Sequence, residues 1–268
     1  MSGAICGIPD IAALIRATGS ASHMTSRQGI YGHRARIGYT SPPLTTEIFP
    51  YEFYKIVPEG VTLIITTLAI VERSKSEIEQ SYDISMKAAR EMAAAGVDIV
   101  VLGGVPINVS RGYENAEQMI RELEAELGIK VSTSASAQAK AAATLGCKKA
   151  VVAQPYTMTE TDRIAGYGRH FGCEILGATG WGSAFNQIGR IPVEAAFEMA
   201  RTLMRRHPDA DSILFPSPHW RVIGAIEPLE RELGVNVMGA LQAIVWDALR
   251  RLGINDRIDG YGRLFREF

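Results

Sequence analysis

Short β-branched runs alternate with longer helical patterns along this chain from Arg36 onward. In the helical pattern at 192–207, Ala195, Met199 and Leu203 recur at the spacing of one helix face. Strands that alternate with helices indicate parallel sheets covered by helices, so the sequence predicts an α/β fold. The expected strands are 35–40, 61–66, 98–103, 130–133, 149–154, 173–177, 212–216 and 235–238.

The chain also repeats itself. VDIVVLGGVP (97–106) resembles ADSILFPSPH (210–219), and IRELEAELGIKV (120–131) resembles IEPLERELGVNV (226–237). One unit of this length cannot cover both faces of its sheet. We therefore expect two pseudo-symmetric lobes, each a parallel sheet flanked by helices, with the active site between them.

The repeat also suggests the domain boundaries. We assign residues 36–147 together with 239–268 to the first lobe, and 148–238 to the second. Residues 1–35 are interpreted as an N-terminal extension or linker, because 19–29 is small, polar and without periodicity.

Composition limits the partners. The chain has 268 residues, 47% hydrophobic and 21% charged, with a net charge of -1 and no block of like charges. This balance of charges gives no basic patch of the kind that binds nucleic acid or an anionic membrane. No apolar run approaches the roughly 20 residues that span a bilayer. We expect a cytoplasmic protein; whether it forms a homo-oligomer stays open.

Metal and cofactor sites are not expected. The three cysteines, Cys6, Cys147 and Cys173, are too few and too scattered for a disulfide framework or a zinc site. GYGRHFG (166–172) and LGG (102–104) are interpreted as glycine-bearing turns, and neither matches a phosphate-binding loop.

Two equivalent loops follow the repeated strands. In parallel α/β sheets ligands bind beyond the carboxyl ends of the strands. If the lobes face each other, GGVP (103–106) and PSPH (216–219) converge on one cleft.

Further motifs occur in a characteristic order over roughly residues 36–268. Through them the chain resembles the aspartate/glutamate racemase superfamily, and most closely its branch of arylmalonate decarboxylases and maleate isomerases. The motifs are IGYTSPP (37–43), VVLGGVPINVSRG (100–112), the AVVAQPY strand ending at Tyr156, GATG (177–180), DSILFPS (211–217) and the tail GYGRLF (260–265).

The resemblance implies two facing acid/base positions, one per lobe, usually both cysteine. Decarboxylases of this branch carry glycine in the first and cysteine in the second. Here the two positions fall on Gly104 and Ser217. Because a serine hydroxyl is far less acidic than a thiol of pKa about 8.5, racemisation by two bases is not expected.

The set of backbone donors is altered as well. Pro106 and Pro218 have no backbone N–H, and each lost oxyanion donor can cost roughly 3 kcal/mol of transition-state stabilisation. His219 is a substitute acid or base with an unperturbed pKa of about 6.5, or else a cap for a helix beginning near Arg221. Ser217 has the same alternative of a capping role.

Other candidates come from the resemblance. Tyr156 matches a family tyrosine that binds the substrate carboxylate, and Thr45 stands where maleate isomerases carry a carboxylate-binding asparagine, followed by Thr46. Asn108 and Ser110 either supply a lost donor or cap a helix near 113.

The leading hypothesis is a cofactor-independent enzyme that acts on a small carboxylate or dicarboxylate, by decarboxylation of a malonate-like acid or a related lyase or isomerase step. Tyr156, Thr45 and the backbone of Gly104 and Val105 would hold the carboxylate. Ser217 would orient the reacting centre and His219 would handle the proton. Two alternatives stay open: a hydrolase with Ser217 as nucleophile and His219 as base, and a non-catalytic carboxylate-binding module.

Overall fold

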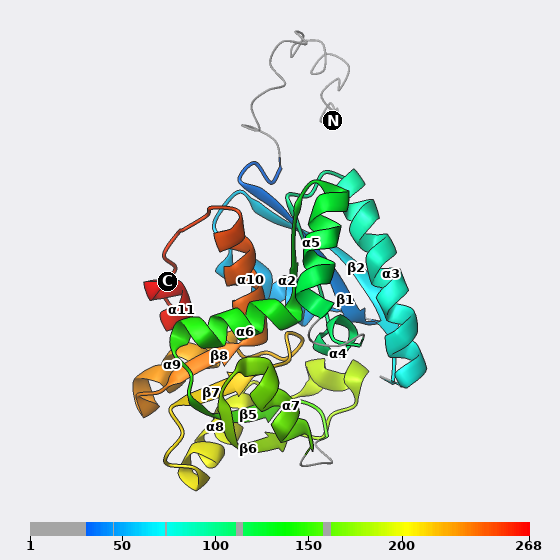
Figure 1. Cartoon of the computed structure of the whole chain (residues 1–268). Coiled ribbons are helices and arrows are strands. Elements are labelled where there is room, and N and C mark those ends of the chain that lie inside the picture. The colour runs from blue at the N-terminus through cyan, green and yellow to red at the C-terminus, as the bar shows by residue number, and fades with distance from the viewer. Residues whose placement is uncertain (1–30, 45, 73, 111–114, 158–161) are drawn as a thin grey trace, which may run out of the picture.

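The computed structural model describes residues 31–268 except 45, 73, 111–114 and 158–161. The expected linker at 19–29 and Cys6 lie outside the described residues. In the described part, two parallel four-stranded sheets flanked by helices lie one above the other in Figure 1. The predicted α/β fold is confirmed.

The two sheets have the same internal order, β2-β1-β3-β4 and β6-β5-β7-β8. Every neighbouring pair of strands is parallel. The strands are β1 (Ala35–Pro43), β2 (Val61–Ile70), β3 (Ile99–Leu102), β4 (Lys130–Thr133), β5 (Lys149–Gln154), β6 (Glu174–Gly180), β7 (Ser212–Phe215) and β8 (Asn236–Gly239).

The sequence repeat corresponds to this shared order. The strands of the first repeated pair, β3 and β7, occupy the same position in their sheets, and so do β4 and β8. Helices α5 and α9 precede β4 and β8, and both end at a glycine in the left-handed conformation, Gly128 (φ 66°) and Gly234 (φ 68°). Glycine is suited to this position because it has no Cβ to clash there.

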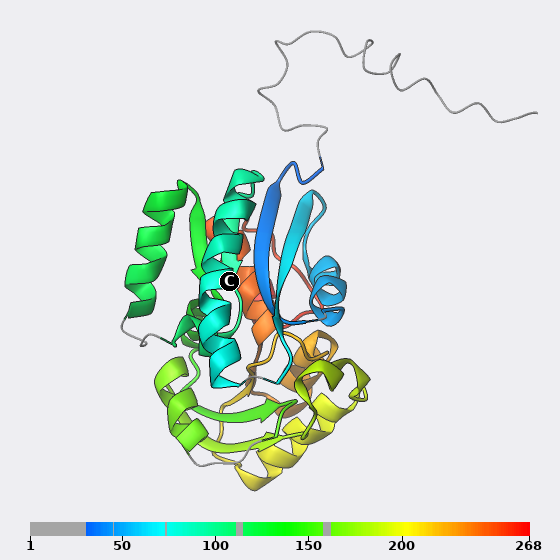
Figure 2. The same ribbon diagram turned by 90° about the vertical axis from the view of Figure 1, so that its right-hand side faces the viewer.

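Helices cover both faces of each sheet. Figure 2 shows α3 on one side of the first sheet and α2 on the other. In the second sheet, α8 packs against β5 and β6, and α9 against β8. The helical elements are α2 (Ile48–Ile56), α3 (Lys75–Ala94), α4 (Val105–Asn108), α5 (Ala116–Leu127), α6 (Ser134–Leu145), α7 (Asp162–Phe171), the 3-10 helix η2 (Phe185–Arg190), α8 (Ala195–Arg206), α9 (Ile223–Leu233), α10 (Ala240–Arg251) and α11 (Arg263–Glu267).

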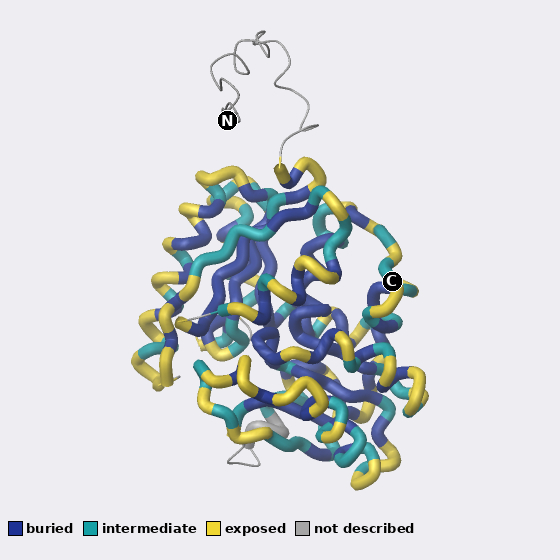
Figure 3. Tube along the Cα trace, turned by 180° about the vertical axis from the view of Figure 1, so that it is seen from behind, coloured by how far each residue is buried: buried dark blue, intermediate teal, exposed yellow. Residues whose placement is uncertain are grey.

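Helices α6 and α10 pack on each other and contact strands of both sheets. One hydrophobic cluster therefore runs from β1 and β3 through these helices to β5, β7 and β8, which Figure 3 shows as the buried interior. Every residue from Ala240 to Leu249 is buried, including Asp247. The Asp247 carboxylate accepts hydrogen bonds from Ser132 (2.6 Å), Lys140 (2.9 Å) and Arg251 (2.8 Å). These donors compensate for the cost of burying its charge.

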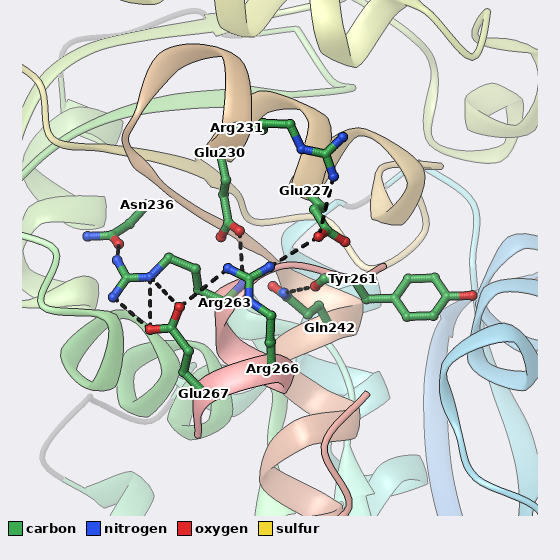
Figure 4. A network of polar contacts seen from close by, with 9 residues as sticks. All are labelled: Glu227, Glu230, Arg231, Asn236, Gln242, Tyr261, Arg263, Arg266 and Glu267. Carbon is green, nitrogen blue, oxygen red and sulfur yellow. Dashed lines mark hydrogen bonds and ion pairs between the residues drawn. The ribbon is translucent and has the colours of Figure 1, made fainter. Parts of the chain in front are cut away.

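The C-terminal tail is fixed against α9 and α10 by polar contacts (Figure 4). The backbone N–H of Arg263 donates to Glu230 Oε2 (2.8 Å), and Gln242 Nε2 donates to the carbonyl of Tyr261 (2.6 Å). Leu264 and Phe265 are fully buried in the main cluster. The tail is thus joined to both α9 and α10.

The predicted lobe boundaries stay a prediction. Ala35, the last residue of the predicted extension, is buried and pairs with Val61, so the first strand begins one residue before the predicted lobe. Within the described ranges, no helix is long and apolar enough to cross a membrane.

Candidate active site

A cavity of about 720 Å³ lies between the two sheets, beyond the carboxyl ends of β3 and β7. Gly104 follows β3 and Ser217 follows β7, and both line this cavity. The parallel strands explain the arrangement, since their carboxyl ends point to the same edge of each sheet. The two positions singled out from the sequence thus face one common space.

Ser217 and Tyr156 form the central polar pair of the cavity. The two hydroxyl oxygens are 3.0 Å apart and share a hydrogen bond. Ser217 is only 3% exposed, and the Tyr156 ring packs against Phe185 with 5.6 Å between ring centroids. The pair joins the end of β5 to the end of β7 and offers two hydroxyl groups to a bound anion.

His219 also lines the cavity, but in a neutral state. Its ring lies 6.3 Å from that of Tyr39 and 6.0 Å from that of Phe49, and the residue is 6% exposed. Its Nε2 atom has no hydrogen-bond partner among the described residues. Burial lowers the pKa of His219 to about 3, so the imidazole is uncharged at neutral pH.

The geometry bears on the alternative roles of Ser217 and His219, which are helix capping and a nucleophile–base pair. Helix α9 begins at Ile223, and Val222 at its N-cap makes no side-chain capping bond. Ser217 and His219, both within the described part, are not hydrogen-bonded to each other; Ser217 bonds to Tyr156 instead. The serine–histidine pair that a hydrolase would need is therefore not formed. Trp220 is buried against Phe215, in the core rather than at the cavity.

The backbone and surroundings of Gly104 disfavour a side chain. Its φ of 83° is a conformation that residues with a side chain rarely adopt. A Cβ built there would lie 2.8 Å from Pro42 Cγ and 3.0 Å from Ile107 Cδ1. A cysteine at the first acid/base position would therefore strain the backbone and displace Pro42 or Ile107. Val105, the next residue, begins α4 and lines the cavity with its neighbours.

The remaining sequence candidates have different positions. Thr45 lies outside the described residues. Thr46 lines a smaller cavity of about 40 Å³ that shares Phe185 and His219 with the large one, and its buried Oγ1 has no partner among the described residues. Asn108 is not part of the large cavity's lining; its Oδ1 accepts a hydrogen bond from Ala135 N (3.3 Å) at the start of α6. Asn108 is thus engaged with the scaffold, as is Ser110, which donates to the carbonyl of Ile107 (2.8 Å).

Several lining residues were not found from the sequence. Gln154, Tyr167 and His170 line the large cavity, and Tyr167 donates a hydrogen bond to Gln154 Oε1 (2.8 Å). Burial lowers the pKa of His170 to about 4. The interpretation of 166–172 as a turn is wrong, because residues up to Phe171 continue α7. The signal that could have located these side chains is the strand end at Gln154, which points to the same edge as Ser217.

Neither described cysteine reaches the cavity. Cys147 and Cys173 lie just before β5 and β6, at the strand ends opposite to the site, and both are buried. Burial raises the pKa of both thiols, for Cys173 to about 11, which disfavours a reactive thiolate. In the part of the chain that the structure describes, no three His, Cys, Asp or Glu side chains gather as a metal site would need.

Two parallel sheets with matching strand order and a cavity between equivalent strand ends agree with the resemblance to the aspartate/glutamate racemase superfamily. Within it, the family model for arylmalonate decarboxylase matches residues 37–265, and the chain belongs to that family.

Curated relatives include enzymes of both kinds. The arylmalonate decarboxylase of Bordetella bronchiseptica is 24% identical over 237 residues, which cover 86% of this chain and 96% of the relative. The maleate isomerase of Geobacillus stearothermophilus is 23% identical over 216 residues, 78% of this chain and 86% of the relative. The predicted kind of enzyme, decarboxylase or isomerase, agrees with both.

Solved structures show the same fold. A liganded double mutant of arylmalonate decarboxylase, with one glycine changed to cysteine and one cysteine changed to serine, gives a TM-score of 0.79 at 23% identity, covering 87% of this chain and 100% of that one. A cysteine-to-alanine variant of the maleate isomerase from Pseudomonas putida S16, solved with maleate, gives a TM-score of 0.76 at 21% identity, covering 87% and 97%.

Proposed function

We propose that this chain is a cofactor-independent lyase or isomerase that acts on a small carboxylate or dicarboxylate, with decarboxylation of a malonate-like acid as its leading reaction. The observation that carries the proposal is the shared cavity, in which Gly104 and the Tyr156–Ser217 pair meet. Membership of the arylmalonate decarboxylase family supports the same reaction class.

Binding of the substrate uses the polar part of the cavity. The hydroxyls of Tyr156 and Ser217 and the backbone N–H of Val105 donate to the carboxylate that is retained. Apolar side chains, among them Ile70, Ile78 and Ile107, form other parts of the lining. A carboxylate placed against such surfaces is poorly solvated and is relieved of its charge when it leaves as carbon dioxide.

The reaction then proceeds without a cofactor. The bond between the central carbon and the departing carboxylate breaks, and its electron pair moves into the retained carboxylate to give an enediolate. Donors that strengthen their bonds to this dianion accelerate the step by about 10²- to 10³-fold each. The geometry favours the Tyr156–Ser217 pair as the source of this stabilisation.

Protonation of the carbon completes the reaction. The enediolate carbon is a much stronger base than an alkoxide, so the Ser217 hydroxyl at the second position can transfer its proton, and solvent restores it through Tyr156. His219 takes a role different from the proton carrier expected from the sequence. Its uncharged imidazole, whose Nε2 atom has no partner among the described residues, would instead form a hydrogen bond with the bound acid.

The test is product formation from a panel of aryl- and alkylmalonates, maleate and related diacids, followed by nuclear magnetic resonance. Ser217→Ala and Tyr156→Phe should lose most activity, whereas Tyr51→Phe, at an exposed tyrosine on α2, should keep it. Absence of product from the whole panel would overturn the proposal. Thermal stabilisation by these acids without turnover would instead favour a binding module.

A further inference from the structure

The size of the large cavity bears on the size of its substrate. At about 720 Å³, the cavity lies within the range of roughly 300–1,000 Å³ that is typical of pockets for drug-sized ligands. The Tyr156–Ser217 pair, which would hold one carboxylate, forms only part of the lining. A malonate that fills the remaining space therefore carries a sizeable substituent on its central carbon, and the rest of the lining selects that substituent.

Gln154 is a polar residue at the end of a strand that is otherwise apolar in its interior. Residues 150–153 of β5 are apolar and fully buried, whereas Gln154 is 3% exposed and lines the cavity. Its backbone carbonyl accepts a hydrogen bond from the N–H of Trp181 (3.0 Å), so the pairing of β5 with β6 fixes its backbone. The position of the side chain at the cavity thus follows from the sheet.

The side-chain amide of Gln154 is satisfied at one end only. The hydroxyl of Tyr167, on α7, donates a hydrogen bond to Oε1 (2.8 Å). The Nε2 atom is buried and has no hydrogen-bond partner among the described residues. Because the bond from Tyr167 holds the oxygen in place, the N–H2 group is the end that is left to donate. A buried donor without an acceptor destabilises a fold, and a bound molecule that supplies an acceptor would remove this cost.

The charges around the cavity favour a neutral acceptor. The described lining contains the acidic residue Glu72 but no Lys or Arg. Both lining histidines are uncharged at neutral pH, because burial lowers the pKa of His170 to about 4 and that of His219 to about 3. A further carboxylate on the substituent would lose its hydration without gaining a counter-ion, whereas a carbonyl oxygen loses much less. An amide or ketone oxygen is therefore the acceptor that suits Gln154.

The separation of the two polar groups limits the length of the substituent. Gln154 and Tyr156 are two residues apart in the chain, so their Cα atoms are at most about 7 Å apart. This short separation favours a carbonyl group two or three bonds from the central carbon.

We propose that Gln154 is a specificity-determining residue, whose N–H2 group donates a hydrogen bond to an amide or ketone oxygen on the substituent of the substrate. The preferred acids are malonates with such a carbonyl group, rather than malonates with a hydrocarbon substituent alone. The reaction in which they take part rests on the proposed function, whereas the choice of substituent rests on the geometry of Gln154 and Tyr167.

The test compares acids of the same shape that differ in one acceptor. Acetonylmalonate carries a ketone, and in 2-methylallylmalonate a methylidene group (=CH2) replaces the ketone oxygen. A second pair has one more methylene group in the substituent. In one of the two pairs, wild-type kcat/KM should be about tenfold higher for the ketone, as expected for one hydrogen bond between neutral groups. Equal kcat/KM values within both pairs would overturn the proposal.

Variants assign the preference to the amide. Gln154→Leu is of similar size but donates no hydrogen bond, so its ratio of kcat/KM for ketone and methylidene should fall about tenfold, to about one or below. Gln154→Glu still accepts the bond from Tyr167 but lacks the N–H2 group, and it should lose the ratio as well. Tyr167→Phe, which no longer orients the amide, should give an intermediate value. Gln118→Leu, at an exposed glutamine on α5, should keep the wild-type ratio.

A ratio of two substrates in one variant does not respond to general damage of the fold, because both values fall together. A wild-type ratio in both Gln154→Leu and Gln154→Glu would overturn the assignment to Gln154.

Binding distinguishes this proposal from the proposed function. Isothermal titration calorimetry gives Kd for both pairs of acids in wild type and in Gln154→Leu, and it needs no turnover. If wild type turns over no acid but binds a ketone about tenfold more tightly than its methylidene partner, the proposed function fails and the role of Gln154 stands. If the acids are turned over but bound without preference, the role of Gln154 alone fails. Absence of binding for both pairs also overturns that role.

Discussion

Replacing Gly104 by alanine measures how firmly the first acid/base position excludes a side chain. The backbone φ of 83° costs an alanine about 1–3 kcal/mol. The new Cβ would also lie 2.8 Å from Pro42 Cγ and 3.0 Å from Ile107 Cδ1. Such crowding in a packed region costs about 1–3 kcal/mol more. We expect a total loss of about 2–6 kcal/mol.

The assay is thermal unfolding, followed by circular dichroism or calorimetry. For a chain of this size, 1 kcal/mol corresponds to roughly 2 °C in Tm, so Gly104→Ala should melt about 4–12 °C below wild type. Two matched glycines separate the contributions. Gly128 has a φ of 66° but nothing within 4 Å of a built Cβ, and Gly224 has neither a positive φ nor a neighbour.

The expected order follows from these surroundings. Gly128→Ala should lose about 1 kcal/mol for its backbone alone, and Gly224→Ala, inside α9, should be neutral or gain up to about 1 kcal/mol. If Gly104→Ala has the same Tm as Gly128→Ala, the crowding argument is refuted, and the first acid/base position has room for a cysteine after all.

Three further predictions follow from other contacts. Tyr156→Phe should lower kcat by about 10²-fold with little change in Tm, because it removes one hydroxyl donor; wild-type kcat in steady-state assays would contradict this. The folded-state pKa of Glu52, about 7 against 4.5, means that the folded chain retains a proton between these values and loses stability as the pH rises through them. Glu52→Gln cannot ionise, so in denaturant titrations it should match wild type near pH 4.5 and exceed it by up to about 3 kcal/mol at pH 8; equal stability at both pH values would speak against a raised pKa. Phe265→Ala should cost about 3–5 kcal/mol in the same titrations, because the ring is fully buried, and a loss below about 1 kcal/mol would show that the tail does not support the core.

Most of the fold could be predicted because hydrophobic patterning is local. Strands 130–133 and 149–154 match the structure at both ends. Others differ where tertiary contacts decide: β2 continues to Ile70, beyond the predicted end at Thr66, because β1 pairs with it that far. Likewise, the glycines of 166–172 argue against a helix, yet Tyr167 and Phe171 pack on the main cluster and hold α7 in place.

The site residues that directly follow strands could be predicted from the sequence. Gly104, Tyr156 and Ser217 each follow a strand, so the rule for parallel sheets locates them. Burial of charged side chains lies outside this rule: YEFYK looks like an ordinary amphipathic helix, and nothing in it predicts that Glu52 is only 3% exposed. The charge state of His219 depends on the rings of Tyr39 and Phe49, which are remote in sequence.

The position of helix α10, which is buried from Ala240 to Leu249, has a consequence for biosynthesis. It follows the last strand of the second sheet, yet it packs against α2 and β3 and binds Ser132 and Lys140 through Asp247. The first sheet therefore leaves the ribosome early but keeps an uncovered apolar face until residues 240–251 have emerged. The second sheet is contiguous in the chain and can form before that. A nascent polypeptide that stalls before Ala240 should consequently be a target for chaperones.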